Sequence, residues 1–162
     1  MTHPFVDHLY RLSARDDRAA LAALRRGLGK PPGTVPAMYP ILMPFIPEED
    51  NRPGRDDVYY LVASLYALNP VREDDLDLGA MYERLGGNSS TESRFRALLQ
   101  ADRDQLASHL RQAMSLARSG KRRTGLDWQL LLHHLRGWDH PDAWVQRTWA
   151  RSFWRPSTSS SP

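Results

Sequence analysis

The spacing of apolar and polar residues follows a helical period along most of the chain. In the first half, apolar side chains recur every three to four residues from Pro4 to Leu12, across residues 21–28, and from Asp56 to Leu68. This spacing gathers them on one face of a helix. The segment from Asp56 to Leu68 is the most apolar of the chain, and we expect it to be a central core helix.

Glycine and proline separate these helical segments. Residues 27–36 are rich in both and predict a loop after the second helix. Residues 37–46 are apolar but contain Pro40 and Pro44, which predicts a short, kinked helix. A polar connection at 48–54 and an acidic loop at 72–78 follow, and a short helix through residues 81–85 ends at the glycines before Asn88.

Helix-start signals continue through the second half. Ser89 and Glu92 have the spacing of a capping box, and Asp102 and Asp127 are expected to cap the next two helices. Pro141 is expected in the first turn of the last helix, where its missing N–H leaves no hydrogen bond unmade.

These patterns predict an all-α fold, a helical bundle of about 8–9 helices in two packed lobes. The N-terminal helical lobe is expected to span residues 1–86 and the basic C-terminal lobe residues 87–155, followed by a Ser- and Pro-rich disordered tail at 156–162.

The net charge of +3 is unevenly distributed. Residues 1–80 hold 9 basic and 12 acidic side chains, whereas residues 81–162 hold 13 and 7. Such an imbalance favours a polyanionic partner. The chain has no cysteine, no apolar run of the roughly 20 residues that span a membrane, and no secretion signal at its start. We therefore expect a cytoplasmic protein with no cofactor and no membrane partner.

Basic residues recur at helical spacing, which suits phosphate backbones better than base edges. On an ideal helix, Arg103, Arg111 and Arg118 fall within about 80° of one another. A solvated helix face would explain any one group, but several together favour nucleic-acid binding. The groups are Arg103, Arg111 and Arg118 with Lys121, Arg122 and Arg123; Arg147, Arg151 and Arg155; and Arg25, Arg26 and Lys30.

The other polar clusters indicate no catalytic or metal site. His133 and His134 are adjacent and point about 100° apart on a helix, so they do not chelate one ion together. The carboxylate groups at 48–50, 56–57 and 74–75 could hold Mg²⁺ or transfer protons, but acidic residues are also common at helix starts. Among the tryptophans, Trp128 and Trp149 are expected in the core and Trp154 on the surface.

Four stretches together resemble the CasB family, the small subunit of the type I-E CRISPR surveillance complex (Cascade). The strongest runs from Leu126 through Gly137-Trp138-Asp139-His140-Pro141 to Phe153, and the next is Arg94-Phe95-Arg96-Ala97-Leu98-Leu99-Gln100-Ala101-Asp102-Arg103. Weaker likenesses lie at 24–26 and 37–45. No single motif is diagnostic, but their order and spacing are specific.

The resemblance implies an all-helical, non-catalytic protein. Two copies would pack head to tail among the other Cascade subunits and contact the backbones of guide RNA, target DNA and the displaced strand. It assigns Arg25, Arg26, Arg94, Arg103 and Arg111 to these contacts. Charge and spacing add Lys30, Arg118, Lys121, Arg122 and Arg123.

Three other functions compete with this one. A helix-turn-helix-like DNA-binding regulator would read bases with Gln129, His133 and Arg136. A metal-dependent phosphohydrolase would use His133, Asp139 and His140. A helical adaptor would bind no nucleic acid.

Overall fold

The computed structural model describes residues 2–86, 88–120 and 123–156. Within these ranges the regular structure is helical, with nine α-helices, three short 3-10 helices and no β-strand, which confirms the all-α prediction. The elements are α1 (Pro4–Ala14), α2 (Arg18–Arg25), η1 (Pro36–Met38), α3 (Tyr39–Leu42), η2 (Met43–Phe45), η3 (Glu48–Asp50), α4 (Asp57–Leu68), α5 (Leu78–Arg84), α6 (Ser89–Leu99), α7 (Arg103–Ser119), α8 (Trp128–Arg136) and α9 (Trp144–Trp154).

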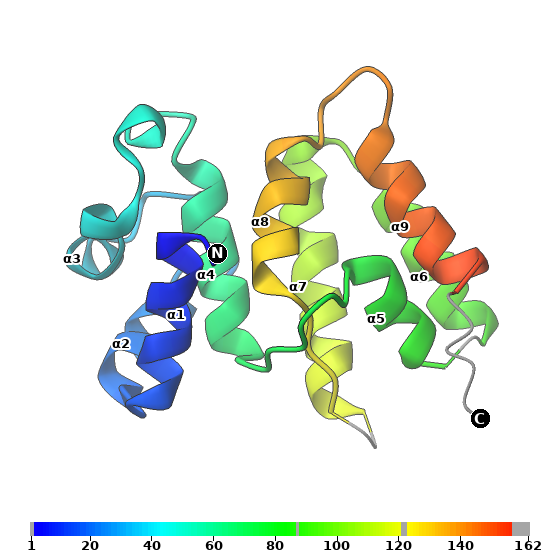
Figure 1. Cartoon of the computed structure of the whole chain (residues 1–162), viewed down its shortest axis with the longest axis horizontal. Helices are drawn as coiled ribbons and strands as arrows, with labels where there is room; N and C mark the ends of the chain where they lie inside the picture. Colours follow the sequence, from blue (N-terminus) through cyan, green and yellow to red (C-terminus); the bar gives the residue numbers. More distant parts are fainter. Residues whose placement is uncertain (1, 87, 121–122, 157–162) are drawn as a thin grey trace.

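Helix α4 is the centre of the bundle. It lies between α1 and α2 on one side and α7 and α8 on the other (Figure 1). Nine of its residues are buried, among them Tyr59, Val62 and Leu65. A helix enclosed on several sides needs apolar residues around most of its circumference, and this confirms the prediction of a core helix.

Helix α5 packs against α9, α6 and α7, at the far end of the molecule from α3 (Figure 1). A Cβ atom at Gly79 of α5 would collide with the backbone carbonyl of Trp149, so the α5 and α9 backbones touch directly. Helix α5 precedes residue 86 in the chain but packs against the helices that follow it. The division into lobes at residue 86 stays a prediction, and residues 157–162 of the predicted tail lie outside the described residues.

Side-chain caps begin most of the longer helices. The carboxylates of Asp102 and Asp127 accept hydrogen bonds from the backbone N–H groups of the first turns of α7 and α8, as predicted. The prediction of Ser89 as the N-cap of this helix was wrong by one residue. Asn88 is the N-cap of α6 and accepts from Thr91 N at 2.8 Å, which makes Ser89 the first helical residue.

The start predicted for the last helix was also wrong. Helix α9 begins at Trp144, after Ala143, which has a left-handed backbone with φ of 51°. The preceding residues turn twice, with His140 N donating to Gly137 O and Ala143 N to His140 O. Trp138 is buried here and donates from Nε1 to the Ala101 carbonyl at 3.1 Å, so tertiary packing holds Pro141 in a turn outside the helix.

The tryptophan predictions are confirmed. Trp128 and Trp149 have no exposed surface, whereas Trp154 is 44% exposed. Across the part of the chain that the structure describes, no helix is long and apolar enough to cross a membrane.

Candidate nucleic-acid interface

Helix α7 presents the longest row of basic residues. Its apolar side is buried against α4, α6 and α5, and the buried residues are Leu106, Leu110, Ala113, Met114 and Ala117, as expected from the sequence. Arg111 and Arg118 are exposed beside this face, and no carboxylate of the described residues pairs with either of them. Their charge is therefore available to an anionic ligand.

Arg103, at the start of the same row, is partly committed to the fold. Its guanidinium pairs with Asp139 and also donates to the Leu135 carbonyl at 3.0 Å. These contacts fasten the start of α7 to the end of α8 and to the turn that follows it. The side chain keeps 45% of its surface exposed, but an anionic ligand would have to compete with Asp139 for its guanidinium.

The N-terminal patch lies at the end of α2 and in the loop after it. Arg25 and Arg26 are exposed, and the Nε of Arg25 donates to the Leu21 carbonyl within its own helix. Lys30 is exposed on the loop of residues 27–35, which faces α7. Arg94 and Arg96 are both exposed on α6, but Arg96 pairs with Glu92, whereas no carboxylate of the described residues pairs with Arg94.

Of the basic loop after α7, the structure describes one residue. Arg123 donates from Nε to the side-chain oxygen of the buried Asn69 at 3.3 Å. The predicted contacts Lys121 and Arg122 lie outside the described residues. Arg147, Arg151 and Arg155 are exposed along α9 and at its end.

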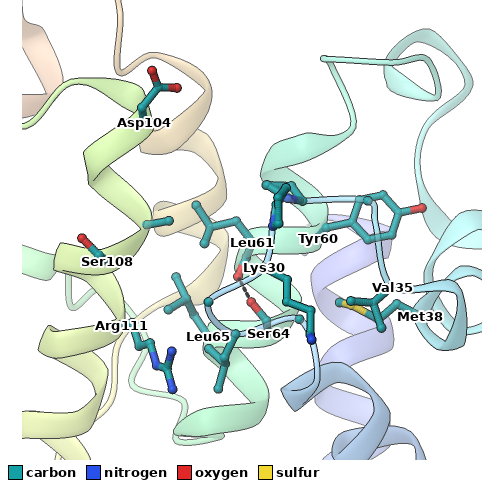
Figure 2. A pocket seen from close by; sticks show the side chains of 17 residues that line it. Lys30, Val35, Met38, Tyr60, Leu61, Ser64, Leu65, Asp104, Ser108 and Arg111 are labelled. Atoms are coloured by element: carbon teal, nitrogen blue, oxygen red, sulfur yellow. Dashed lines mark hydrogen bonds between the residues drawn. The ribbon is translucent and has the colours of Figure 1, made fainter.

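A cavity of about 330 Å³ separates the 27–35 loop from α4 and α7 (Figure 2). Its walls are mainly apolar, and its charged lining residues are Lys30, Arg111 and Asp104. The sequence indicated a loop at this place but not the cavity. Asp104 and Arg111 are seven residues apart and therefore lie on one face of the helix, and this spacing was the sign in the sequence that they could line one site.

A second charged cluster surrounds the buried carboxylate of Asp50. It was also not predicted from the sequence. The Tyr59 hydroxyl donates to Asp50 at 2.6 Å, and Arg136 and Arg55 pair with it at 3.0 and 3.4 Å. Burial opposes ionisation of Asp50, but these donors outweigh burial and hold the pKa of Asp50 below its ordinary value. Arg136 of α8 is thereby tied to the N-terminal half of the chain.

Several polar side chains of α8 form hydrogen bonds or ion pairs within the protein. His134 is buried and accepts a hydrogen bond from Trp149, while His133 is exposed. Within the described ranges, no group of three or more His, Asp or Glu side chains could hold a metal ion. Gln129 accepts from His3 N at 2.6 Å, and Arg136 pairs with Asp50. Two of the three residues that a helix-turn-helix regulator would use for base contact are therefore bonded within the protein.

Comparison with known proteins agrees with this arrangement. The sequence profile of the CRISPR-associated protein Cse2 family matches residues 20–154. The CRISPR-associated protein Cse2 of Thermus thermophilus is 40% identical over 161 residues, which cover 96% of this chain and 90% of that protein. The crystal structure of CasB from Thermus thermophilus superposes with a TM-score of 0.79 at 36% identity, covering 96% of this chain and 99% of that one.

A chain of a solved CRISPR RNA-guided surveillance complex is also similar, with a TM-score of 0.74 and 26% identity over 94% of this chain and 90% of that one. Profile, sequence and fold thus agree over nearly the whole length. As its motifs predicted, the chain belongs to the Cse2 family of CRISPR-associated proteins, which includes the solved CasB proteins.

Proposed function

We propose that this protein is a non-catalytic small subunit of a CRISPR Cascade complex that binds nucleic-acid backbones without sequence specificity. Its ligands are the guide RNA–target DNA hybrid and the displaced DNA strand. Membership of the Cse2 family and likeness to a chain of an RNA-guided surveillance complex support the assembly. A cytoplasmic location is part of the same proposal.

One observation carries the nucleic-acid role. Six of the predicted contacts are exposed and form no ion pair or hydrogen bond with another side chain of the described residues; we call them the six exposed cations. They are Arg25, Arg26, Lys30, Arg94, Arg111 and Arg118. By contrast, arginines that were not predicted as contacts often form ion pairs, as do Arg11, Arg18, Arg55, Arg72, Arg84, Arg96 and Arg136.

The proposed mechanism follows from the energetics of strand exchange. Replacing a DNA duplex by an RNA–DNA hybrid is nearly balanced in free energy, so modest backbone contacts shift the equilibrium. Arginine and lysine side chains bind phosphates whatever the base sequence. A protein that holds both the hybrid and the displaced strand slows their re-annealing and stabilises the open complex.

Exposed apolar side chains at both ends of the molecule support contacts with other protein chains, including a second copy in head-to-tail order. Met43 and Phe45 are 40% and 37% exposed beside α3, and Trp154 is 44% exposed at the end of α9. Helix α3 and the C-terminal end of α9 lie at opposite ends of the long axis (Figure 1). A head-to-tail arrangement brings two such ends together.

The test is binding of the purified protein to unrelated single- and double-stranded DNAs over a salt series. A variant with Arg94, Arg111 and Arg118 changed to Ala is compared with the unmodified protein. Each phosphate contact contributes about 0.7–0.9 to the slope of log affinity against log salt, so the variant is expected to lose about 2–3 from that slope.

The matched control changes Arg11, Arg18 and Arg96 to Ala, which removes the same charge from three exposed arginines that form ion pairs. Its slope should stay close to that of the unmodified protein. Equal losses in both variants would mean that net charge alone drives binding. Affinity for one DNA sequence only would favour a regulator, and the absence of binding at low salt would favour an adaptor.

A further inference from the structure

The cavity between the 27–35 loop and helices α4 and α7, which we call the junction pocket, combines an apolar interior with charges of opposite sign. Its apolar walls come from Leu28, Val35, Met38, Leu61 and Leu65. Its volume of about 330 Å³ is near the lower end of the range found for pockets that hold small organic ligands. A single flat heterocycle suits such a space better than a large ligand.

The charges around the junction pocket are separated. Arg111 on α7 and Lys30 on the facing loop lie on either side of Leu65 in Figure 2, whereas Asp104 lies at the start of α7. Asp104 forms no ion pair within the described ranges, so its carboxylate is free to accept hydrogen bonds. A ligand with anionic groups at one end and amino groups at the other matches this polarity.

The 27–35 loop, which forms one wall of the junction pocket, has a restricted backbone. Gly29 and Gly33 have φ values of 75° and 76°, which glycine adopts without strain, and Pro31 and Pro32 between them restrict the backbone. A Cβ atom at Gly29 would lie 2.8 Å from Nη1 of Arg111, so the loop backbone rests against that guanidinium. The wall and the cation are thus positioned together before any ligand arrives.

We propose that the junction pocket takes one unpaired base of a single-stranded nucleic acid, with Lys30 and Arg111 binding the adjoining phosphates and Asp104 facing the base. The proposal rests on the proposed function and deepens it. A base within a duplex is stacked and paired and cannot enter, so the ligand is single-stranded, as the displaced strand is. An aspartate carboxylate accepts from exocyclic amino groups, so cytosine is preferred to thymine at this one position, while the backbone contacts remain independent of sequence.

The test measures affinity of the unmodified protein for two single-stranded oligonucleotides of equal length, one of deoxycytidine and one of abasic sites. Both carry the same phosphates. Burial and stacking of a base in a protein site contribute enough that we expect about tenfold weaker binding of the abasic strand. An oligothymidine strand should bind with intermediate affinity, and the Asp104→Ala variant should bind the cytidine and thymidine strands alike.

A pocket-filling variant tests the location. Ala107 lines the junction pocket, and Ala107→Phe fills it without changing charge. This variant should bind the cytidine and abasic strands equally and retain the salt dependence of the unmodified protein. Ala19→Phe, at an exposed position of α2, is the control and should keep the tenfold difference.

Equal affinity of the unmodified protein for cytidine and abasic strands, with steep salt dependence, would overturn the junction-pocket proposal and leave the backbone function intact. A pocket that accepts a protein side chain instead would give this result. Absence of binding to both strands at low salt would overturn the proposed function as well. Because the first comparison uses the unmodified protein, the result does not depend on whether Ala107→Phe folds.

Discussion

The Nδ1 atom of His134 accepts a hydrogen bond from the indole Nε1 of Trp149 at 2.9 Å. Both rings are buried, and the bond joins α8 to α9 within the core. Because Nδ1 accepts, the neutral imidazole carries its proton on Nε2. Protonation of Nδ1 would place two donors face to face and a charge in the core, and burial is the main cause that lowers the pKa of His134.

The stability of the protein should therefore fall as the pH drops below the ordinary histidine value of 6.5. A base whose pKa is lowered by folding binds its proton more readily in the unfolded chain, so acid favours unfolding. The free energy of unfolding, measured with urea between about pH 5 and pH 8, should rise with pH and level off above about 7.

The matched variant is His134→Asn, in which the amide oxygen can still accept from Trp149 but does not titrate. It should be less stable at neutral pH because Asn leaves part of the space empty. Its stability should also change less between pH 5 and 7. The buried His8 and half-buried His3 also have lowered pKa values, mainly through burial, so some slope remains in the variant. If the stability of the variant changed with pH as much as that of the unmodified protein, His134 would not be the source of the pH dependence.

The direct backbone contact between α5 and α9 predicts a large effect of Gly79→Ala. The added methyl group would meet the carbonyl of Trp149, and the helices can relieve the collision only by moving apart. Overpacking of this kind costs about 1–3 kcal/mol, which chemical denaturation would measure. Gly54→Ala is the comparison, because space is open there and only its φ of 87° opposes a side chain; it should cost less.

Ala143 predicts a stabilising substitution. Its left-handed backbone is unfavourable for alanine by about 1 kcal/mol but is open to glycine. Ala143→Gly should raise the free energy of unfolding by up to about 1 kcal/mol, whereas Ala150→Gly inside α9 should lower it by about 0.5–1 kcal/mol. The two alanines are seven residues apart, and opposite changes in the free energy of unfolding would identify backbone conformation as the cause. Equal losses of stability in the two variants would exclude it.

The ion pair between Arg103 and Asp139 predicts a gain of binding. Asp139→Asn should free the Arg103 guanidinium and make the salt slope of DNA binding steeper by about one contact, 0.7–0.9. The pair is half-exposed on both sides, so the cost in stability should be below about 1 kcal/mol. Asp142→Asn removes an equal charge from a neighbouring exposed position and serves as control. If both variants gain equally, net charge is responsible.

Much of the fold follows from local chemistry. The caps at Asp102 and Asp127 join residues two or three positions apart, and the apolar face of α7 follows from helical period alone, so neither depends on the rest of the chain. The starts of α6 and α9 were predicted wrongly because neighbouring residues compete as caps or because tertiary packing decides. Asn88 and Ser89 are both good caps side by side, and the turn before α9 is held by the buried ring of Trp138.

The sequence by itself determined the all-helical architecture, the family and the positions of most exposed basic residues, because period, capping and charge are read over a few neighbouring positions. Tertiary structure decided which of those charges are free. Arg103 and Arg111 belong to one row in the sequence, but folding brings Asp139 to the first and an open cavity with Lys30 to the second. Such pairings depend on how distant segments pack, and spacing along the chain carries no information about that.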